Sequence, residues 1–203
     1  MPSPPISPKP AWTVIETETV AACRVFEVER RRSVRTDALG SRSHDFFVIG
    51  SADFCNIVAV TADDELVLVR QWRHGVGAET LEIPGGLVDP GESALAAAQR
   101  ELAEETGFTA SGWAVLGRTS PNAAIQSNRC TTFLAMGARR SQATHFDETE
   151  DCELLTMPWT EVQRCIADGR IDHAIIIAAL HFETLRRAGV LAVEPLPAAA
   201  ALV

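Results

Sequence analysis

Hydrophobic and polar positions alternate, or form short apolar runs, along much of the first half of the chain. Residues 23–30 roughly alternate, which is typical of a half-buried strand. Residues 46–49, 56–61 and 66–72 are β-branched or aromatic runs separated by polar turns, and they also predict strands. The charged stretch from Arg30 to Ser43 predicts turns. Further strands are predicted over residues 80–83, 113–119, 130–136 and 154–157.

The pattern changes to that of a helix at residue 93. Residues 93–106 are rich in alanine and leucine, Glu92 or Ser93 can cap the start, and Gly107 stands where a helix commonly ends. Two more helices are predicted over residues 159–168 and 173–187. Many strands with a few helices between them predict a mixed α/β fold.

Composition limits the classes of function. The 203 residues suit one domain, and 46% hydrophobic with 22% charged residues is ordinary globular composition. A net charge of −9 argues against nucleic-acid binding and against a polybasic membrane surface. The apolar stretch 174–180 is far too short for a membrane span, and residues 1–10 lack the apolar segment of a secretory signal. The five widely spaced cysteines contain no CxxC pair, which predicts free thiols in a reducing cytoplasm.

An acidic stripe lies on the helix predicted at 93–106. At about 100° per residue, Glu101, Glu104 and Glu105 fall within one arc of roughly 100°. Like charges at this spacing repel, and an anion near the helix C-terminus is unfavourable. Such a stripe can be a solvated face. It can also bind one or two Mg²⁺ ions, which prefer carboxylate, carbonyl and phosphate oxygens.

The spacing of these residues favours the second explanation. Gly86, Glu92 and the run Arg100-Glu101-Leu102-Ala103-Glu104-Glu105-Thr106-Gly107-Phe108 follow one another at the intervals of the Nudix box, G-x5-E-x7-R-E-U-x-E-E-x-G-U, where U is a bulky apolar residue. Every specified position is filled. The sequence therefore resembles the Nudix hydrolase family from about residue 23 to 187, which implies an α/β/α sandwich with mixed β-sheets and hydrolysis dependent on Mg²⁺ or Mn²⁺.

The resemblance also implies roles for single residues. Glu101 and Glu105 match the main metal ligands, Glu104 a further ligand, and the carbonyl of Gly85 the backbone ligand. Glu92 and Arg100 match a structural ion pair that ties the loop to the helix, since bidentate Arg–carboxylate geometry suits such a role. A substrate contact is the alternative for Arg100.

The segment before the box indicates a branch of the family. Gln71-Trp72-Arg73 and Leu81-Glu82-Ile83-Pro84-Gly85-Gly86 resemble the ADP-ribose and nucleoside-diphosphate-sugar pyrophosphatases. Trp72 replaces the usual Tyr and Gly85 the usual Ala, and both changes are tolerable. The resemblance implies cleavage of ADP-ribose, or of a related nucleoside diphosphate sugar, to a nucleoside monophosphate and a sugar phosphate.

A second acidic run, residues 145–153, precedes the strand predicted at 154–157. In this branch the corresponding loop carries the catalytic glutamate, so Glu148 and Glu150 are candidates for the base and for a further metal ligand. The sequence does not order the two. As a bare charge run the segment can also be a solvated loop.

Substrate contacts are expected at Arg73, Glu82, Trp12 and Pro121, although packing explains a lone aromatic such as Trp12 equally well. The cluster Arg30, Arg31, Arg32 and Arg35 is either a solvated turn or a contact for phosphate or a partner. The histidines 44, 74, 173 and 181 have no metal-ligand spacing and are interpreted as packing or surface residues.

Members of this branch are commonly homodimers with exchanged N-terminal strands. The expected organisation is an N-terminal β arm over residues 1–22 that can be exchanged in a homodimer, a Nudix domain over 23–190 and a flexible tail over 191–203. Two alternatives remain: a non-catalytic Nudix sensor, and a Nudix hydrolase that acts on another nucleoside diphosphate derivative. An RNA-processing enzyme is disfavoured by the acidic balance.

The negative charge is concentrated at the proposed metal site. Residues 79–107 hold seven acidic residues and one arginine, and residues 145–153 hold five acidic residues without Lys or Arg. Bound divalent cations would reverse this local field and attract a small diphosphate. The expected partner is therefore a nucleoside diphosphate-linked small molecule, with no nucleic acid and no membrane.

Overall fold

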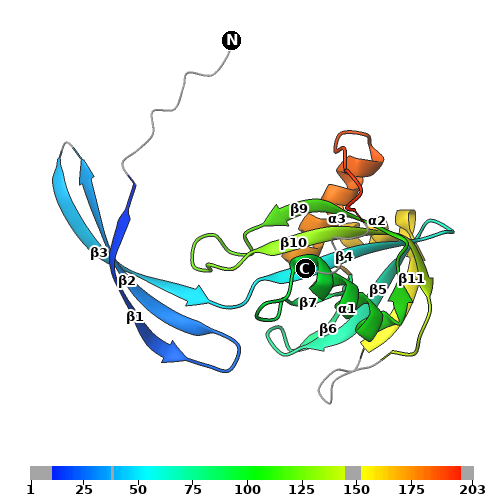
Figure 1. Cartoon of the computed structure of the whole chain (residues 1–203), viewed down its shortest axis with the longest axis horizontal. Helices are drawn as coiled ribbons and strands as arrows, with labels where there is room; N and C mark the ends of the chain where they lie inside the picture. The colour runs from blue at the N-terminus through cyan, green and yellow to red at the C-terminus, as the bar shows by residue number, and fades with distance from the viewer. Residues whose placement is uncertain (1–10, 38, 145–151, 198–203) are drawn as a thin grey trace, which may run out of the picture. The chain divides into compact units, whose positions relative to one another are not determined.

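The computed structural model describes residues 11–37, 39–144 and 152–197. It divides the chain into two compact units, shown in Figure 1. The first unit comprises the chain up to Ser51 together with residues 122–128, and the second comprises the remainder. The two units divide between Ser51 and Ala52. The start of the Nudix domain at residue 23 stays a prediction.

The first unit is built on a three-stranded antiparallel sheet in the order β1-β2-β3. Its strands are β1 (Thr13–Ala22), β2 (Glu27–Asp37) and β3 (Gly40–Gly50). The turn prediction for Arg30 to Ser43 was wrong, because most of this stretch lies in β2 and β3. The charged residues are compatible with strands here because Arg30 and Arg32 of the central strand both pair with Asp45 of β3, at 3.1 and 3.0 Å.

The segment 122–128 belongs to the first unit through hydrogen bonds to the end of β3. The amide of Ile49 donates to the carbonyl of Ile125 at 2.7 Å, and the amide of Ser127 donates to the carbonyl of Ile49 at 3.1 Å. Just past the end of β3, Ser51 Oγ accepts a hydrogen bond from Asn128 Nδ2 at 2.9 Å. These bonds satisfy backbone groups at the end of β3 that would otherwise need water.

The second unit is built on an eight-stranded mixed sheet with the central order β11-β5-β4-β10-β8. Strands β4 and β10 run parallel, β5 is antiparallel to β4, and β6, β7 and β9 pair with β5, β4 and β10. The strands are β4 (Phe54–Thr61), β5 (Glu65–Arg73), β6 (Ala78–Glu82), β7 (Gly85–Leu87), β8 (Phe108–Thr109), β9 (Gly112–Thr119), β10 (Cys130–Arg140) and β11 (Cys152–Pro158). The helices are α1 (Ala94–Thr106), α2 (Trp159–Ala167) and α3 (Ala174–Arg187).

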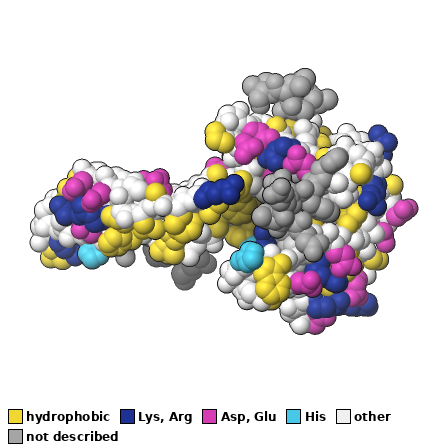
Figure 2. All heavy atoms as spheres, turned by 90° about the horizontal axis from the view of Figure 1, so that it is seen from below, with side chains coloured by type: hydrophobic (Ala, Val, Ile, Leu, Met, Phe, Trp, Pro, Cys, Tyr) yellow, Lys and Arg dark blue, Asp and Glu magenta, His cyan; other side chains and the backbone are white. Residues whose placement is uncertain are grey.

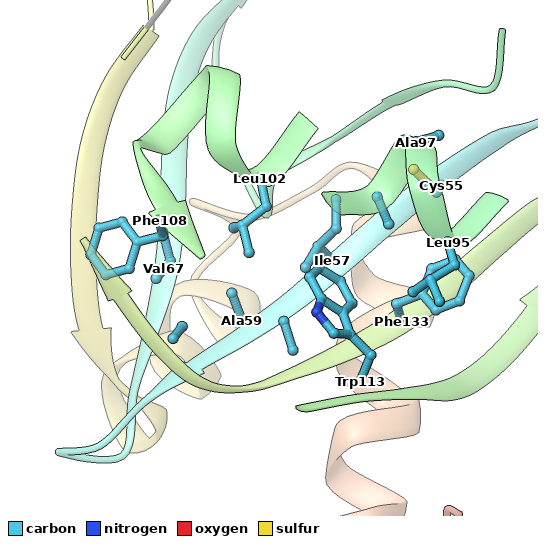
Figure 3. Close-up of a cluster of buried hydrophobic side chains, with 13 residues drawn as sticks. Cys55, Ile57, Ala59, Val67, Leu95, Ala97, Leu102, Phe108, Trp113 and Phe133 are labelled. Atoms are coloured by element: carbon cyan, nitrogen blue, oxygen red, sulfur yellow. The ribbon is translucent and has the colours of Figure 1, made fainter. Parts of the chain in front are cut away.

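Two hydrophobic clusters cover the two faces of this sheet. Leu95 and Leu102 of α1 belong to one cluster, which includes Ile57 of β4 (Figure 3). The other cluster contains residues of α2 and α3, such as Leu180, together with Val58 of β4. Neighbouring residues of one strand point to opposite faces. The predicted α/β/α sandwich with mixed sheets is therefore confirmed.

The helix that carries the acidic stripe has the predicted ends. Ser93 Oγ accepts a hydrogen bond from the amide of Ala96 at 3.1 Å, and Gly107 adopts a left-handed conformation with φ 71°. Leu102 is fully buried, which contributes about 1.5–3 kcal/mol to docking α1 on the sheet. Burial of this apolar stripe fixes which side chains of α1 face away from the sheet core.

The last described residues return to the sheet. The amide of Leu196 donates to the carbonyl of Trp113 at 2.7 Å, and Pro195 forms an isolated bridge with Ala114 of β9. The described part of the segment predicted to be a flexible tail is thus bound to β9. Among the described residues, no helix is long and apolar enough to span a membrane.

Candidate active site

The site centres on the glycine turn that precedes α1. Strand β7 pairs with β4, and the carbonyl of Pro84 accepts a hydrogen bond from the amide of Ile57 at 2.8 Å. The amide of Gly85 does not point to a strand carbonyl but donates to Glu105 Oε2 at 3.0 Å. Glu105 is 4% exposed, so this carboxylate is held against the turn from within the protein.

Gly86 brings a second carboxylate to the same turn. A Cβ atom at position 86 would meet the carboxylate of Glu101, with Oε2 2.7 Å away. Only glycine leaves room for this close approach between turn and helix. Glu101 and Glu105 are four residues apart on α1, and both carboxylates therefore lie at the turn formed by Gly85 and Gly86.

Arg100 ties the loop before α1 to the helix. Its Nε and Nη2 donate to the two carboxylate oxygens of Glu92 at 3.2 and 3.0 Å, and Nη2 also donates to the carbonyl of Leu87 at 3.1 Å. Its Nη1 donates to Glu101 at 2.8 Å and to Glu104 at 3.2 Å. The hydrogen bonds from Arg100 hold the pKa of Glu92 below its usual value, although burial opposes the shift. The ion pair between Arg100 and Glu92 was predicted from the sequence. In the structure Arg100 also binds the carbonyl of Leu87 and the carboxylate of Glu101, so it connects the loop, the turn and the helix.

The donor set at the turn suits a hard cation. No three His, Cys, Asp or Glu side chains converge on one point within the described residues. Mg²⁺ commonly uses only one or two carboxylates and completes its shell with water and substrate phosphate. Glu101, Glu105 and the backbone carbonyl of Gly85 fit that requirement. Glu104 precedes Glu105 on α1, and its side chain is more exposed.

A pocket of about 600 Å³ opens beside the turn. Gly85 and Gly86 form part of its lining, and so do Arg73, Glu82 and His173. The first segment of α3 therefore lies on the same pocket as the glycine turn. A cavity of this size is typical of a site for a nucleotide-sized ligand.

Glu82 is the centre of a hydrogen-bond network in this pocket. It is 2% exposed, and Arg73 binds it with two bonds, Nε to Oε1 at 3.0 Å and Nη2 to Oε2 at 2.8 Å. Thr80 Oγ1 donates to Oε1 at 2.6 Å, and His173 Nδ1 lies 3.3 Å from the same oxygen. Burial alone raises the pKa of Glu82, but the hydrogen bonds from His173, Arg73 and Thr80 outweigh it and place the pKa well below its usual value. Glu82 is therefore ionised at neutral pH and serves to orient Arg73 and His173.

Sequence reasoning assigned neither His173 nor Asn56 to the site, and it also missed His74. His173 was interpreted as a packing or surface residue, but it lines the pocket and contacts Glu82. Asn56 lies in the strand predicted at 56–61 and also lines the pocket. A polar residue at the start of an otherwise apolar, buried strand was the one available signal for Asn56.

Four other predicted site residues are not in the lining of this pocket or fall outside the described residues. Trp12 belongs to the first unit, where its ring packs edge-on against Phe46 at a centroid distance of 5.2 Å. Pro121 follows β9 and is not among the described residues that line the pocket. Glu148 and Glu150 lie outside the described residues.

The sandwich with a glycine turn beneath an acidic helix defines the class of protein, and the comparisons agree with it. Residues 55–180 match the model of the NUDIX domain, and the chain belongs to the Nudix family. An ADP-ribose pyrophosphatase of Mycobacterium tuberculosis (strain ATCC 25618 / H37Rv) is 31% identical over 173 residues, which cover 83% of this chain and 81% of that protein. The ADP compounds hydrolase NudE of Escherichia coli (strain K12) is 29% identical over 168 residues, covering 83% and 89%. A crystal structure of ADP compounds hydrolase is similar with a TM-score of 0.76 at 27% identity, covering 92% of this chain and 100% of that chain.

Proposed function

We propose that the protein is a Nudix hydrolase that cleaves the pyrophosphate bond of ADP-ribose, or of a related nucleoside diphosphate sugar, with Mg²⁺ or Mn²⁺. The observation that carries the proposal is the meeting of the Glu101 and Glu105 carboxylates at the Gly85–Gly86 turn, which also lines the 600 Å³ pocket. A diphosphate at this turn has room beside it for one of the groups that it links. The names of the relatives at about 30% identity support the same substrate class.

Different residues of the site are proposed to bind the cation and the substrate. Glu101, Glu105 and the Gly85 carbonyl would bind the divalent cation, which supplies Lewis-acid polarisation of the phosphate oxygens. Arg100 keeps the loop of Glu92 and the helix of Glu101 in register. The products are a nucleoside monophosphate and a sugar phosphate, formed when water attacks a phosphorus atom.

Arg73 is proposed to contact the substrate. It is oriented by Glu82, and its side chain is 43% exposed at the pocket. The catalytic base remains proposed at Glu148 or Glu150. A general base of this kind contributes about 10² to 10⁴-fold to the rate.

The direct test is hydrolysis of a substrate panel. The protein is incubated with Mg²⁺ and ADP-ribose, nucleotide sugars, NADH or dinucleoside polyphosphates, and the products are resolved by mass spectrometry. We expect AMP and ribose phosphate from ADP-ribose. No turnover of any compound would contradict the proposal and favour a non-catalytic sensor, while turnover of a different compound would place the chain among hydrolases of another nucleoside diphosphate derivative.

A variant tests the assignment of the metal-binding face. Glu105→Gln keeps the shape of a buried side chain, and we expect it to lower kcat by about 100-fold or more, which corresponds to roughly 2.7 kcal/mol. Glu194→Gln, at an exposed glutamate, is the matched control and should leave the rate unchanged. Near-normal rates for Glu105→Gln would refute the metal assignment.

The homodimer remains part of the proposal. The β1–β3 sheet carries exposed hydrophobic side chains, and Figure 2 shows hydrophobic atoms gathered along this unit. They include Val14, Ile15, Val20, Phe46 and Phe47. Such a surface supports association between two copies, which light scattering of the purified protein tests directly. A cytoplasmic location is likewise proposed, supported by the five free cysteines.

A further inference from the structure

Asn56 is a polar residue in a buried stretch of β4, where most residues are apolar. It lies in β4 and is 4% exposed. Its neighbours Cys55 and Ile57 belong to the cluster beneath α1, so the side chain of Asn56 points to the opposite face of the sheet, as Val58 does two residues later. On that face it lines the pocket together with residues of α3.

The amide nitrogen of Asn56 has no hydrogen-bond partner among the described residues. Buried polar groups in folded proteins nearly always have a partner, because leaving one unpaired costs more than a hydrogen bond contributes. An apolar side chain at this position would avoid that cost. The presence of an unpartnered donor beside a pocket indicates that a ligand atom supplies the acceptor.

The glycine turn accommodates the Asn56 amide. A Cβ atom at position 85 would lie 2.9 Å from Asn56 Oδ1 and would meet the carbonyl oxygen of Cys55 more closely still. Glycine therefore lets the amide group lie directly against the turn. Asn56 therefore lies beside the proposed diphosphate position at Gly85 and lines the same pocket.

The other polar groups of the pocket include both donors and acceptors of hydrogen bonds. Arg73 and Glu82 form an ion pair, and Asp172 adds a carboxylate next to His173 at the start of α3. His173 Nδ1 lies 3.3 Å from Glu82 Oε1, which leaves Nε2 for a hydrogen bond with a ligand. Among the described residues, the lining holds two carboxylates, those of Glu82 and Asp172, and one arginine, which disfavours a second phosphate group here. A hydroxyl group, which both donates and accepts, satisfies such a mixture.

We propose that Asn56, together with His173, forms a subsite for the hydroxyl groups of a sugar joined to the diphosphate, with Asn56 Nδ2 donating to a hydroxyl oxygen. This inference rests on the proposed function, because it assumes that the diphosphate lies at the Gly85–Gly86 turn. The sugar can be the terminal one or the ribose of the nucleoside. Both sources share the chemistry that the subsite recognises.

The variant Asn56→Leu separates a ligand-binding role from a structural one. It replaces the amide by an apolar side chain with the same branched shape and number of heavy atoms, so the donor is lost. We expect the melting temperature to stay the same or rise, while kcat/KM for ADP-ribose falls about tenfold, chiefly through KM. A lower melting temperature with an unchanged kcat/KM would overturn the proposal. Asn56→Asp also removes the amide donor and adds a negative charge beside the proposed diphosphate, so its loss of kcat/KM should be at least as large.

Modified substrates identify which sugar is recognised. One substrate replaces the terminal ribose of ADP-ribose by a methyl group, and the other removes the 2′- and 3′-hydroxyl groups of the adenosine. If Asn56 binds the terminal sugar, its variant and the wild type become equal on the first substrate only; if it binds the adenosine ribose, they become equal on the second only. An equal deficit on ADP-ribose and on both modified substrates would overturn the proposal.

The same variants separate failure of this inference from failure of the proposed function. Normal turnover by wild type with no effect of Asn56→Leu refutes the subsite and leaves the hydrolase intact. If wild type turns over none of these compounds, the hydrolase proposal fails, and calorimetric titration with ADP-ribose and Mg²⁺ judges the subsite. About tenfold weaker binding by Asn56→Leu would support it, and equal binding, or no binding by either protein, would overturn it.

Discussion

Removal of Arg73 is expected to destabilise the fold because it leaves a buried carboxylate without its main counter-ion. Breaking a buried ion pair by removing one partner typically costs about 3–5 kcal/mol. The Arg73 side chain is 43% exposed, and Thr80 and His173 still donate to Glu82, so the expected loss for Arg73→Ala is smaller, about 2 kcal/mol. For a chain of this size that loss lowers the melting temperature by about 4–8 °C.

A second arginine of the same strand provides a matched control. Arg70 pairs with Glu153 at 2.8 Å, and the Arg70 side chain is also 43% exposed. Its partner is 60% exposed, whereas Glu82 is 2% exposed. Arg70→Ala is therefore expected to cost less than about 1 kcal/mol. Urea unfolding at pH 7, followed by tryptophan fluorescence, measures both variants, and equal losses for the two arginines would refute the argument from burial.

The double variant and the pH dependence test the cause. Glu82→Gln removes the buried charge, so Arg73→Ala combined with Glu82→Gln should lose less stability than the sum of the single changes. The pKa of folded Glu82 lies below its usual value, so its contribution to stability is present above the unfolded pKa of about 4.3 and is lost as the pH falls through the folded pKa. The difference in free energy of unfolding between wild type and Arg73→Ala should therefore become smaller below about pH 4. If the difference in free energy of unfolding between wild type and Arg73→Ala stayed constant down to pH 2, the loss would come from packing and not from the charge of Glu82.

Two further predictions concern the glycine turn and the cysteines. Gly86→Ala should lower activity and raise the Mg²⁺ concentration needed for half-maximal rate, because the new Cβ displaces the Glu101 carboxylate. In the control Gly112→Ala, the closest contact of the new Cβ is the flexible end of Met136, and this variant should stay active. Equal rates for both variants would contradict this role of Gly86. Alkylation of the native protein at pH 8, followed by peptide mass spectrometry, should modify the exposed Cys23 first and spare Cys55, since burial raises the pKa of the Cys55 thiol to about 12. Labelling of Cys55 as fast as of Cys23 would show that the strand under α1 opens readily.

The sequence predicted the helix of the site well, because several independent signals agreed there. Ser93 and Gly107 marked its ends, the apolar stripe marked the face packed on the sheet, and the spacing of the carboxylates marked the face that meets the glycine turn. Parts of the strands of the first unit were predicted, but the continuation of β2 and β3 through residues 30–43 was missed for a physical reason. The arginines of β2 resemble a solvated turn until the acidic residues of β1 and β3, distant in sequence, are placed opposite them.

The pocket was harder to predict than the helix. Arg73 and Glu82 were identified by their resemblance to a known branch, but their mutual orientation was not. The contact between Glu82 and His173 joins residues about ninety positions apart and depends on how α3 packs on the sheet. The meaning of Asn56 likewise depends on what surrounds it, since only the folded structure shows that its amide nitrogen has no partner among the described residues.

The association of residues 122–128 with the end of β3 means that no single cut separates the two units of the chain. A protease that cleaves the peptide bond after Ser51 would leave the first 51 residues attached only by non-covalent bonds to a loop that is itself part of the other fragment. Removal of those residues by truncation would instead leave backbone groups of that loop, such as the carbonyl of Ile125 and the amide of Ser127, without their hydrogen-bond partners in β3. The two fragments should therefore be more stable together than apart. Co-expression of residues 1–51 with residues 52–203 should give a reconstituted, nicked protein.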